Sequence, residues 1–143
     1  MGRSWAEQRT EAARLQARRL SERQDAEHAR AEMMLAEFVA AARDADLAAE
    51  PLVVRGYGGR GTARTPLRGW YLRTDRTAAV SDDGGFYVLT APLTLLDRIR
   101  GVRPEPKRPP LVLGAGGKDG DSIDLAMALD RLLPGWQGTA PGA

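Results

Sequence analysis

The stretch that decides the fold is residues 3–50, which read RSWAEQRTEAARLQARRLSERQDAEHARAEMMLAEFVAAARDADLAAE. It contains no glycine and no proline, whereas residues 51–143 hold nearly all of both. Its dominant residues, Ala, Glu, Arg, Gln and Leu, are strong helix formers. Ser4, with Glu7 three positions later, is typical of a helix N-cap, and Pro51 would stop the helix. We therefore predict one helix from about Ser4 to Ala49.

The apolar side chains of this predicted helix gather in its second half. Five recur at spacings of three and four: Met34, Leu35, Phe38, Val39 and Ala42. Such a stripe is typical of a helix that packs on a core. A helix of 46 residues would be about 70 Å long, whereas a body of about 100 residues is only about 35 Å across. We expect residues 1–50 to form the helix, with roughly the first 30 projecting from the body.

Two interpretations of the projecting part remain open. It offers little apolar area, which is typical of a solvated, partly disordered segment. It also fits a heptad frame, broken by Thr10, Gln24 and Glu27, with Ala6, Ala13 and Leu20 on one seam. That frame favours a helix which docks on a protein partner or on a second copy through residues 1–49.

Residues 51–135 are predicted to form a small body. Strand-like stretches cover residues 52–55, 68–73, 77–81 and 85–90, and Asp82-Asp83-Gly84 is typical of a hairpin turn. Together they predict an antiparallel meander in which Trp70 and Leu72 face the core and Tyr71 and Tyr87 lie on an open, partly wet face. The fold class is therefore α+β: a long N-terminal helix, then a small antiparallel meander packed with a C-terminal helix.

The end of the chain supplies the remaining elements of the body. Residues 93–99 favour a short helix, residues 103–110 a stiff proline-rich connector, and residues 111–113 a strand. A final helix, capped by Asp121 or Ser122, places Leu125, Leu129, Leu132 and Leu133 on one face. Residues 136–143 are expected to be a flexible tail, with Trp136 set apart from it.

Catalytic and cofactor chemistry finds little support. The sequence has no cysteine, and His28, its only histidine, lies in the polar part of the first helix, so a Ser-His-acid or Cys-His system is not expected. Residues 113–122 resemble a phosphate-binding loop, but Val112 and Asp119 break the Walker pattern and three aspartates would repel a phosphate. The same aspartates do not fit an EF-hand, because Ile123 replaces a ligand. We predict a structural turn there, no cofactor, no metal site and no enzymatic activity.

Two further aspartates, Asp82 and Asp83, are neighbours at the hairpin tip. A pair of carboxylates can serve acid–base catalysis when burial moves their pKa values apart. Adjacent residues on an exposed turn are expected to titrate normally instead. We interpret them as turn residues.

The charge distribution points to one candidate binding segment. Residues 51–76 carry six arginines against Asp75 alone, and residues 98–108 carry five basic groups against Glu105, although the whole chain is only +2. Arginine, glycine and aromatic residues alternate in the first stretch, as in flexible binders of single-stranded nucleic acid. The alternative function is therefore binding of nucleic acid or an anionic ligand through six residues: Arg55, Tyr57, Arg60, Arg64, Arg68 and Tyr71.

Three motifs carry a resemblance: Arg68-Gly-Trp-Tyr-Leu-Arg73, Asp83-Gly-Gly-Phe-Tyr-Val-Leu89 and Gly116-Gly-Lys-Asp-Gly-Asp-Ser122. Over roughly residues 30–133 the chain resembles small actinobacterial proteins of unknown function. The resemblance implies a soluble bacterial protein and brings no site with it.

No segment approaches 18 consecutive apolar residues and no secretory signal is present, so we expect a cytoplasmic protein without a membrane partner. The principal prediction is a non-enzymatic interaction or regulatory module that acts through its projecting helix.

Overall fold

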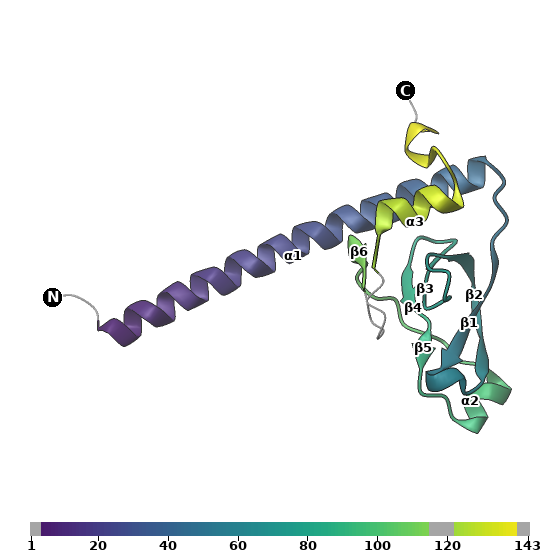
Figure 1. The fold of residues 1–143 in the computed structure, drawn as a ribbon, viewed down its shortest axis with the longest axis horizontal. Helices are drawn as coiled ribbons and strands as arrows, with labels where there is room; N and C mark the ends of the chain where they lie inside the picture. The colour runs from purple at the N-terminus through teal and green to yellow at the C-terminus, as the bar shows by residue number, and fades with distance from the viewer. Residues whose placement is uncertain (1–3, 115–121, 140–143) are drawn as a thin grey trace.

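The computed structural model describes residues 4–114 and 122–139 (Figure 1). The elements in chain order are α1 (Trp5–Asp44), β1 (Glu50–Gly56), the 3-10 helix η1 (Tyr57–Gly59), β2 (Thr62–Tyr71), β3 (Ala78–Ser81), β4 (Phe86–Val88), β5 (Thr90–Ala91), α2 (Leu95–Arg100), β6 (Val112–Leu113), β7 (Ile123–Asp124), α3 (Leu125–Leu132) and the 3-10 helix η2 (Trp136–Thr139). A long N-terminal helix, mainly antiparallel strands and a C-terminal helix confirm the predicted α+β class.

Helix α1 begins as the sequence predicted and ends earlier. The Ser4 hydroxyl accepts a hydrogen bond from the Glu7 N–H at 3.2 Å, which confirms Ser4 as the N-cap. At the other end Asp46 adopts a left-handed conformation with φ 54°, and the Leu47 N–H reaches back to the Ala42 carbonyl. This is a Schellman motif, which usually has glycine in the left-handed position. Because an aspartate takes that place, the stop could not be predicted from a glycine signal.

Only part of α1 touches the body. Its buried residues are Ala31, Leu35, Phe38, Val39, Ala41 and Ala42. All residues from 4 to 27 are exposed, and the first side-chain bonds to the body come from Asp25 and His28. Residues 4–24, which we call the arm, therefore extend about 30 Å beyond the body, as Figure 1 shows.

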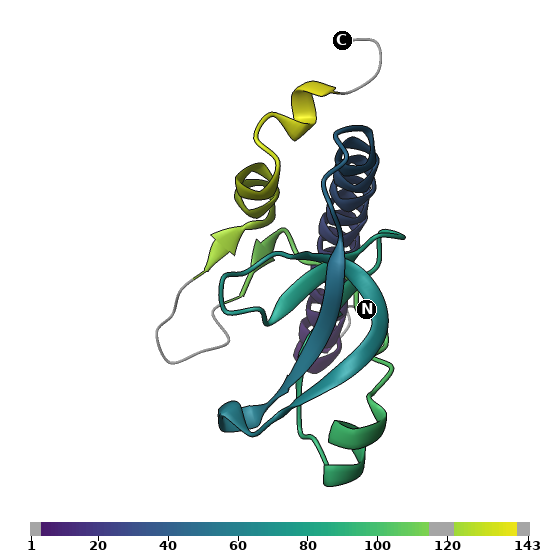
Figure 2. The same ribbon diagram turned by 90° about the vertical axis from the view of Figure 1, so that its right-hand side faces the viewer.

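The sheet curls until both of its edges belong to one segment of chain. Its strand order is β4-β3-β2-β1-β5, and only Leu89 separates β4 from β5. The Leu89 N–H donates to the Thr77 carbonyl at 2.8 Å, and the Leu89 carbonyl accepts from the Arg55 N–H at 2.9 Å. One residue thus joins the β3 side of the sheet to β1, with which β5 pairs in parallel. The curl is visible in Figure 2.

The inner face of the curled sheet forms its own small core. Five buried residues make it up: Leu52, Val54, Ala79, Tyr87 and Leu89. Leu67, Tyr71, Leu93 and Val102 pack against them at the margin. The prediction of a wet face was therefore wrong, since Tyr87 is only 6% exposed and Tyr71 is half-buried. A flat meander would have left this face open, and closure of the sheet covers it.

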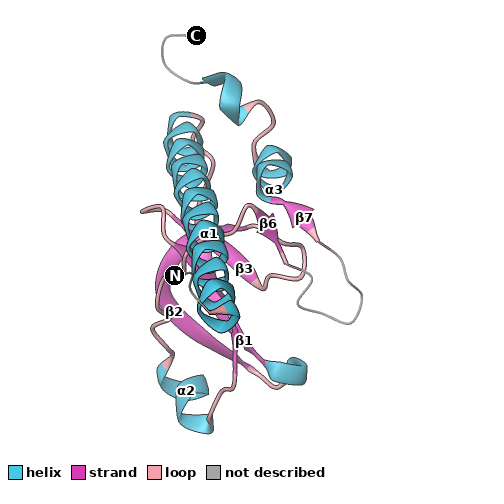
Figure 3. Cartoon of the chain, turned by 90° about the vertical axis from the view of Figure 1, so that its left-hand side faces the viewer, coloured by secondary structure: helices cyan, strands magenta, loops and turns pink. Residues whose placement is uncertain are grey.

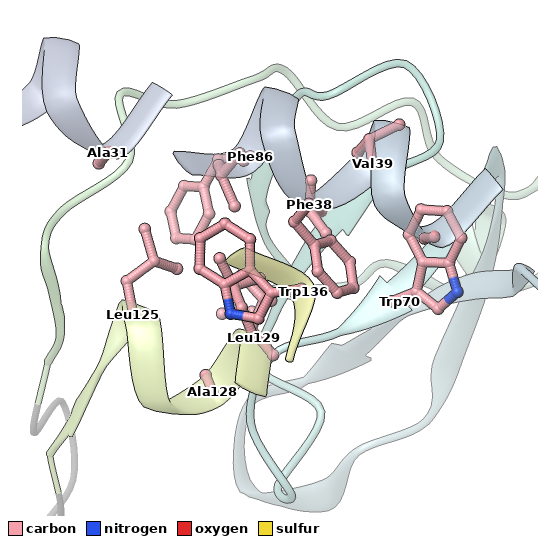
Figure 4. Packing of buried hydrophobic residues seen from close by; sticks show 14 of the residues in the cluster. Ala31, Phe38, Val39, Trp70, Phe86, Leu125, Ala128, Leu129 and Trp136 are labelled. Atoms are coloured by element: carbon pink, nitrogen blue, oxygen red, sulfur yellow. The ribbon is translucent and has the colours of Figure 1, made fainter. Parts of the chain in front are cut away.

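The outer face carries the main core, where α1 and α3 meet the sheet (Figure 4). Phe38 stands at the centre: its ring meets Trp70 edge-on at 5.6 Å and Trp136 at 6.4 Å between ring centroids. Trp70 and Leu72 face this core as predicted. Trp136 is 3% exposed and begins η2, so the packed structure extends into the segment expected to be a tail. Residues 140–143 lie outside the described part of the chain.

Helix α3 follows a short strand that the sequence did not reveal. β7 pairs antiparallel with β6, through Val112 with Asp124 and Leu113 with Ile123. The helix therefore starts at Leu125, with Asp124 as N-cap, and not at the predicted cap of Asp121 or Ser122. Leu125 and Leu129 are fully buried, as its predicted face requires. Figure 3 shows α3 and the β6–β7 ribbon on the same side of the body.

The proline-rich connector is fixed between α1 and the edge of β4. The Lys107 N–H donates to the Phe86 carbonyl at 2.8 Å, which covers part of that edge. On the other side His28 Nδ1 lies 2.8 Å from the Pro109 carbonyl, and Arg108 pairs with Asp25 at 2.9 Å. The single histidine thus links the connector to α1.

The aromatic centre of the main core gives a direct test. Phe38→Ala should lower the free energy of unfolding by about 3–5 kcal/mol, because the cavity removes contacts to both tryptophans. Met33→Ala on the same helix is the matched control: Met33 is 64% exposed, so its loss should cost under about 0.5 kcal/mol. Chemical denaturation followed by circular dichroism measures both. Equal losses in the two variants would contradict this account of the core.

Candidate functional site

The six residues predicted to bind an anion lie on a single hairpin. Arg55 is on β1, Tyr57 and Arg60 are in or beside the turn, and Arg64, Arg68 and Tyr71 are on β2. Strand β2 starts at Thr62, so more than half of the segment expected to be flexible is regular strand paired with β1. The irregular part of the segment is confined to residues 57–61.

Steric constraints fix the conformation of that turn. Gly61 has φ 82°, and a Cβ there would lie 2.6 Å from Nε of Arg98 on α2. A Cβ on Gly56 would collide with the Arg60 carbonyl. Glycine is thus favoured at Gly61 by its positive φ, and required at Gly56 by the close approach of the Arg60 backbone. The turn leaves the Tyr57 side chain 61% exposed.

The structure gives three of the six residues other partners. Arg64 Nη2 donates to the Ile99 carbonyl at 3.2 Å, and Arg68 Nη2 donates to the Ala49 carbonyl at 2.9 Å. The Tyr71 hydroxyl accepts from the Val53 N–H at 2.9 Å, and the Arg76 guanidinium lies 5.3 Å from its ring centre. These contacts hold β2 to its neighbours. They also leave Tyr71 without an open ring face for stacking on a base.

Arg55 and Tyr57 instead line a groove of about 1030 Å³. Its walls come from the η1 turn, the β2–β3 turn, the edge of β4 and the β6–β7 ribbon with α3. Its polar side chains include Arg73, Asp75, Thr77 and Arg131, which the sequence did not single out. Three of them lie in the turn between β2 and β3, whereas Arg131 lies on α3, so no local pattern predicts the group as a whole. Closure of the sheet brings them together.

Most of the charged side chains in this groove are already engaged in hydrogen bonds or ion pairs within the protein. Arg73 Nε pairs with Asp75 at 3.2 Å, and Arg131 Nη2 donates to the Leu72 carbonyl at 3.2 Å. Thr77 donates to the Asp75 carboxylate from its hydroxyl at 2.7 Å and from its N–H at 3.1 Å. Burial acts to raise the pKa of Asp75, but the bonds from Thr77 and Arg73 outweigh it, and the pKa lies below its ordinary value. An aspartate that stays ionised suits binding or structure better than proton transfer.

The two aspartates at the β3–β4 turn have different roles. The Asp83 carboxylate accepts from the Ser81 hydroxyl and from the Gly85 N–H, and these bonds lower the pKa of Asp83. The expectation that Asp83 titrates normally was therefore wrong. Its partners lie within the turn, which supports the interpretation as a turn residue. Asp82 donates its N–H to the Arg68 carbonyl at 2.8 Å.

A second surface, which the sequence reading missed, is built on α2. We call it the α2 tip: Leu95, Leu96 and Ile99 with Arg98, Arg100 and Arg103. The three aliphatic side chains are 69%, 54% and 64% exposed. They recur at i, i+1 and i+4, which gathers them on one side of the helix. Apolar residues in a short helix are usually interpreted as core residues. Here only the flanking residues Leu93 and Val102 pack on a core.

The arm is the third surface. Trp5 is 78% exposed, Leu20 52% and Leu15 44%, and none of them contacts the body. The arm also carries five arginines and three glutamates, so its net charge is positive.

Comparison with known proteins gives no relative to guide these assignments: no protein family, curated protein or solved structure matches the chain. In the described ranges, residues 4–114 and 122–139, no helix is long and apolar enough to cross a membrane. The same residues contain no cluster of three or more acidic or histidine side chains suited to a metal ion. Lys118, Asp119 and Asp121 of the loop interpreted as a structural turn lie outside the described residues.

The lowered pKa of Asp75 predicts a pH-dependent contribution to stability. A carboxylate with a depressed folded-state pKa stabilises the fold above its unfolded pKa of about 4, and this stabilisation is lost as the pH falls through the folded value. Asp75→Asn should cost about 1 kcal/mol at neutral pH, since the side chain is half exposed to solvent. Its unfolding free energy should converge with that of the parent chain as the pH approaches about 2. Denaturation across this pH range checks the prediction, and a constant difference at every pH would contradict it.

Proposed function

We propose that this chain is a non-enzymatic interaction module whose arm docks on a helix of a protein partner, while the body anchors and orients the arm. The observation that carries this proposal is that about half of a 40-residue helix lies beyond every contact with the body. Helices in proteins owe most of their stability to packing of an apolar face. A long helical extension without such packing would therefore be stabilised by binding to a partner.

The arm presents a defined seam for such a partner. Ala6, Ala13 and Leu20 share one side of α1, spaced by sevens. Ala31 and Phe38, which are buried against the body, belong to the same side of the helix at about 100° per residue. A partner helix on this seam would therefore continue the surface along which α1 already packs. The small alanine side chains let two helices approach closely.

The exposed Trp5 and the net positive charge of the arm indicate which kind of partner it would bind. Trp5 is a large exposed aromatic at the far end of the arm, and tryptophan is enriched at the residues that dominate binding energy. Five arginines against three glutamates favour a partner helix with an acidic flank. A second copy of the chain is the alternative partner, but two basic arms side by side would repel each other modestly.

The alternative function, binding of nucleic acid or an anionic ligand through residues 55–76, has less support. Of its two tyrosines, Tyr71 is occupied and only Tyr57 is exposed. All four arginines are exposed, but the guanidinium groups of Arg64 and Arg68 each donate to a backbone carbonyl of the body. Two arginines and one tyrosine make a weaker anion site than the sequence indicated.

Two leucines of the arm provide a matched test. Leu15 and Leu20 have similar exposure and lie about 140° apart around the helix, so only Leu20 is on the seam. Leu20→Glu should weaken partner binding about tenfold, whereas Leu15→Glu should leave it nearly unchanged. Sedimentation of the full chain shows whether the partner is a second copy. Affinity capture with the three chains as baits, followed by titration of the captured protein, covers a different partner.

Circular dichroism must first show that the three chains have the same helix content. If neither self-association nor any captured protein depends on Leu20, the arm is not a docking helix and the proposal fails.

A further inference from the structure

The α2 tip is the most exposed group of large aliphatic side chains on the body. The residues that flank the helix turn inward instead: Leu93 and Val102 pack on the inner core of the curled sheet. α2 is thus attached by its two ends, and among the described residues Leu95, Leu96 and Ile99 are exposed and belong to neither core. In Figure 1 the helix lies at the extremity of the body furthest from α1.

Several bonds hold α2 firmly in this position. Thr94 and Asp97 form a capping box, with bonds of 3.1 and 3.0 Å between each backbone N–H and the other's side chain. At the C-terminal end the Gly101 N–H bonds to the Asp97 carbonyl, and the Val102 N–H bonds to the Arg64 carbonyl, both at 2.8 Å. Six residues rarely form a stable helix in isolation. Here the caps keep one in place with its apolar side directed away from the protein.

Positive charge surrounds the aliphatic side chains. Arg98, Arg100 and Arg103 are exposed and lie within or just beyond the helix. Between Asp83 and Glu105 the sequence has one acidic residue, Asp97, whose carboxylate is engaged in the capping box. The surface therefore combines an aliphatic centre with an uncompensated cationic rim.

We propose that the α2 tip docks this protein peripherally on an anionic lipid surface. In this arrangement Leu95, Leu96 and Ile99 enter the boundary between headgroups and acyl chains, and the three arginines bind lipid phosphates. Interfacial helices bind membranes by this combination of apolar burial and electrostatic attraction. Docking of this kind needs no membrane-spanning segment. It departs from our expectation of no membrane partner, whose basis was the lack of such a segment.

The chemistry of the tip favours lipid over the other polyanions. Nucleic-acid binders stack bases on aromatic rings, and the apolar side chains of α2 are aliphatic. A stable protein interface buries about 800 Å² on each partner, which three side chains on two turns do not supply by themselves. A bilayer requires no complementary pocket and accepts a protruding helix.

The test uses the full chain and sedimentation with sucrose-loaded vesicles of phosphatidylcholine, with or without about one-third phosphatidylglycerol, at about 0.1 M salt. The aliphatic variant is Leu95→Gln, Leu96→Gln, Ile99→Gln. Its matched control is Leu15→Gln, Met33→Gln, Met127→Gln, which removes three exposed apolar side chains elsewhere. The charge variant is Arg100→Gln, Arg103→Gln, and its control is Arg14→Gln, Arg18→Gln on the arm.

We expect the parent chain to bind only the anionic vesicles. The aliphatic variant should lose about tenfold or more in partitioning, and each arginine removed should cost about fivefold, while both controls bind like the parent. Circular dichroism verifies that the variants are folded.

The proposal would be overturned if the parent chain did not bind the anionic vesicles. It would also be overturned if the aliphatic variant bound them as strongly as the parent chain. Retention on single-stranded DNA that depends on the arginines but not the leucines would assign the tip to nucleic acid instead. Leu20→Glu should bind vesicles normally, so failure here and failure of the arm proposal are distinguishable.

Discussion

Closure of the sheet at Leu89 is the constraint on which the rest of the body depends. The N–H of this residue bonds to Thr77, next to β3, its C=O accepts from Arg55 on β1, and its side chain is fully buried in the inner core. Edge strands leave backbone groups unpaired, and closure is one of the ways in which proteins cover them. Because one segment serves as both edges, a sheet of short strands acquires an interior, and its outer face is left for the helices.

Two separate cores follow from this closure, and each positions one candidate surface. The outer core, centred on Phe38, Trp70 and Trp136, holds the second half of α1 and so sets the direction in which the arm projects. The inner core holds Leu93 and Val102, which fix the two ends of α2. Arm and tip are thus attached to opposite faces of the same sheet. The two proposed docking events would therefore not compete for the same surface.

Local signals predicted the longer elements, but they missed β7 and the end of α1, and they did not predict how the elements combine. The absence of Gly and Pro in residues 3–50 and the cap at Ser4 predicted α1, and residue alternation placed Trp70 on the core side. Parallel pairing of β1 with β5 joins residues far apart in sequence, so alternation predicted an open face where the structure has a core. For the same reason Tyr71 was expected on an exposed platform. The groove beside Arg55 depends on four separate segments, and no spacing within the sequence encodes it.

The helicity of the arm depends on the body in a way that affects its function. Starting a helix is costly, whereas adding a residue to an existing one is nearly neutral, so residues 31–42 act as a permanent nucleus for the residues before them. The arm can then fray at its end while it keeps its direction. Because the arm is already helical before it binds, it would lose little conformational entropy on binding a partner helix, and the entropy cost of binding would be lower. On the proposed function, the packing around Phe38 would therefore contribute to binding at a seam that begins several helical turns away.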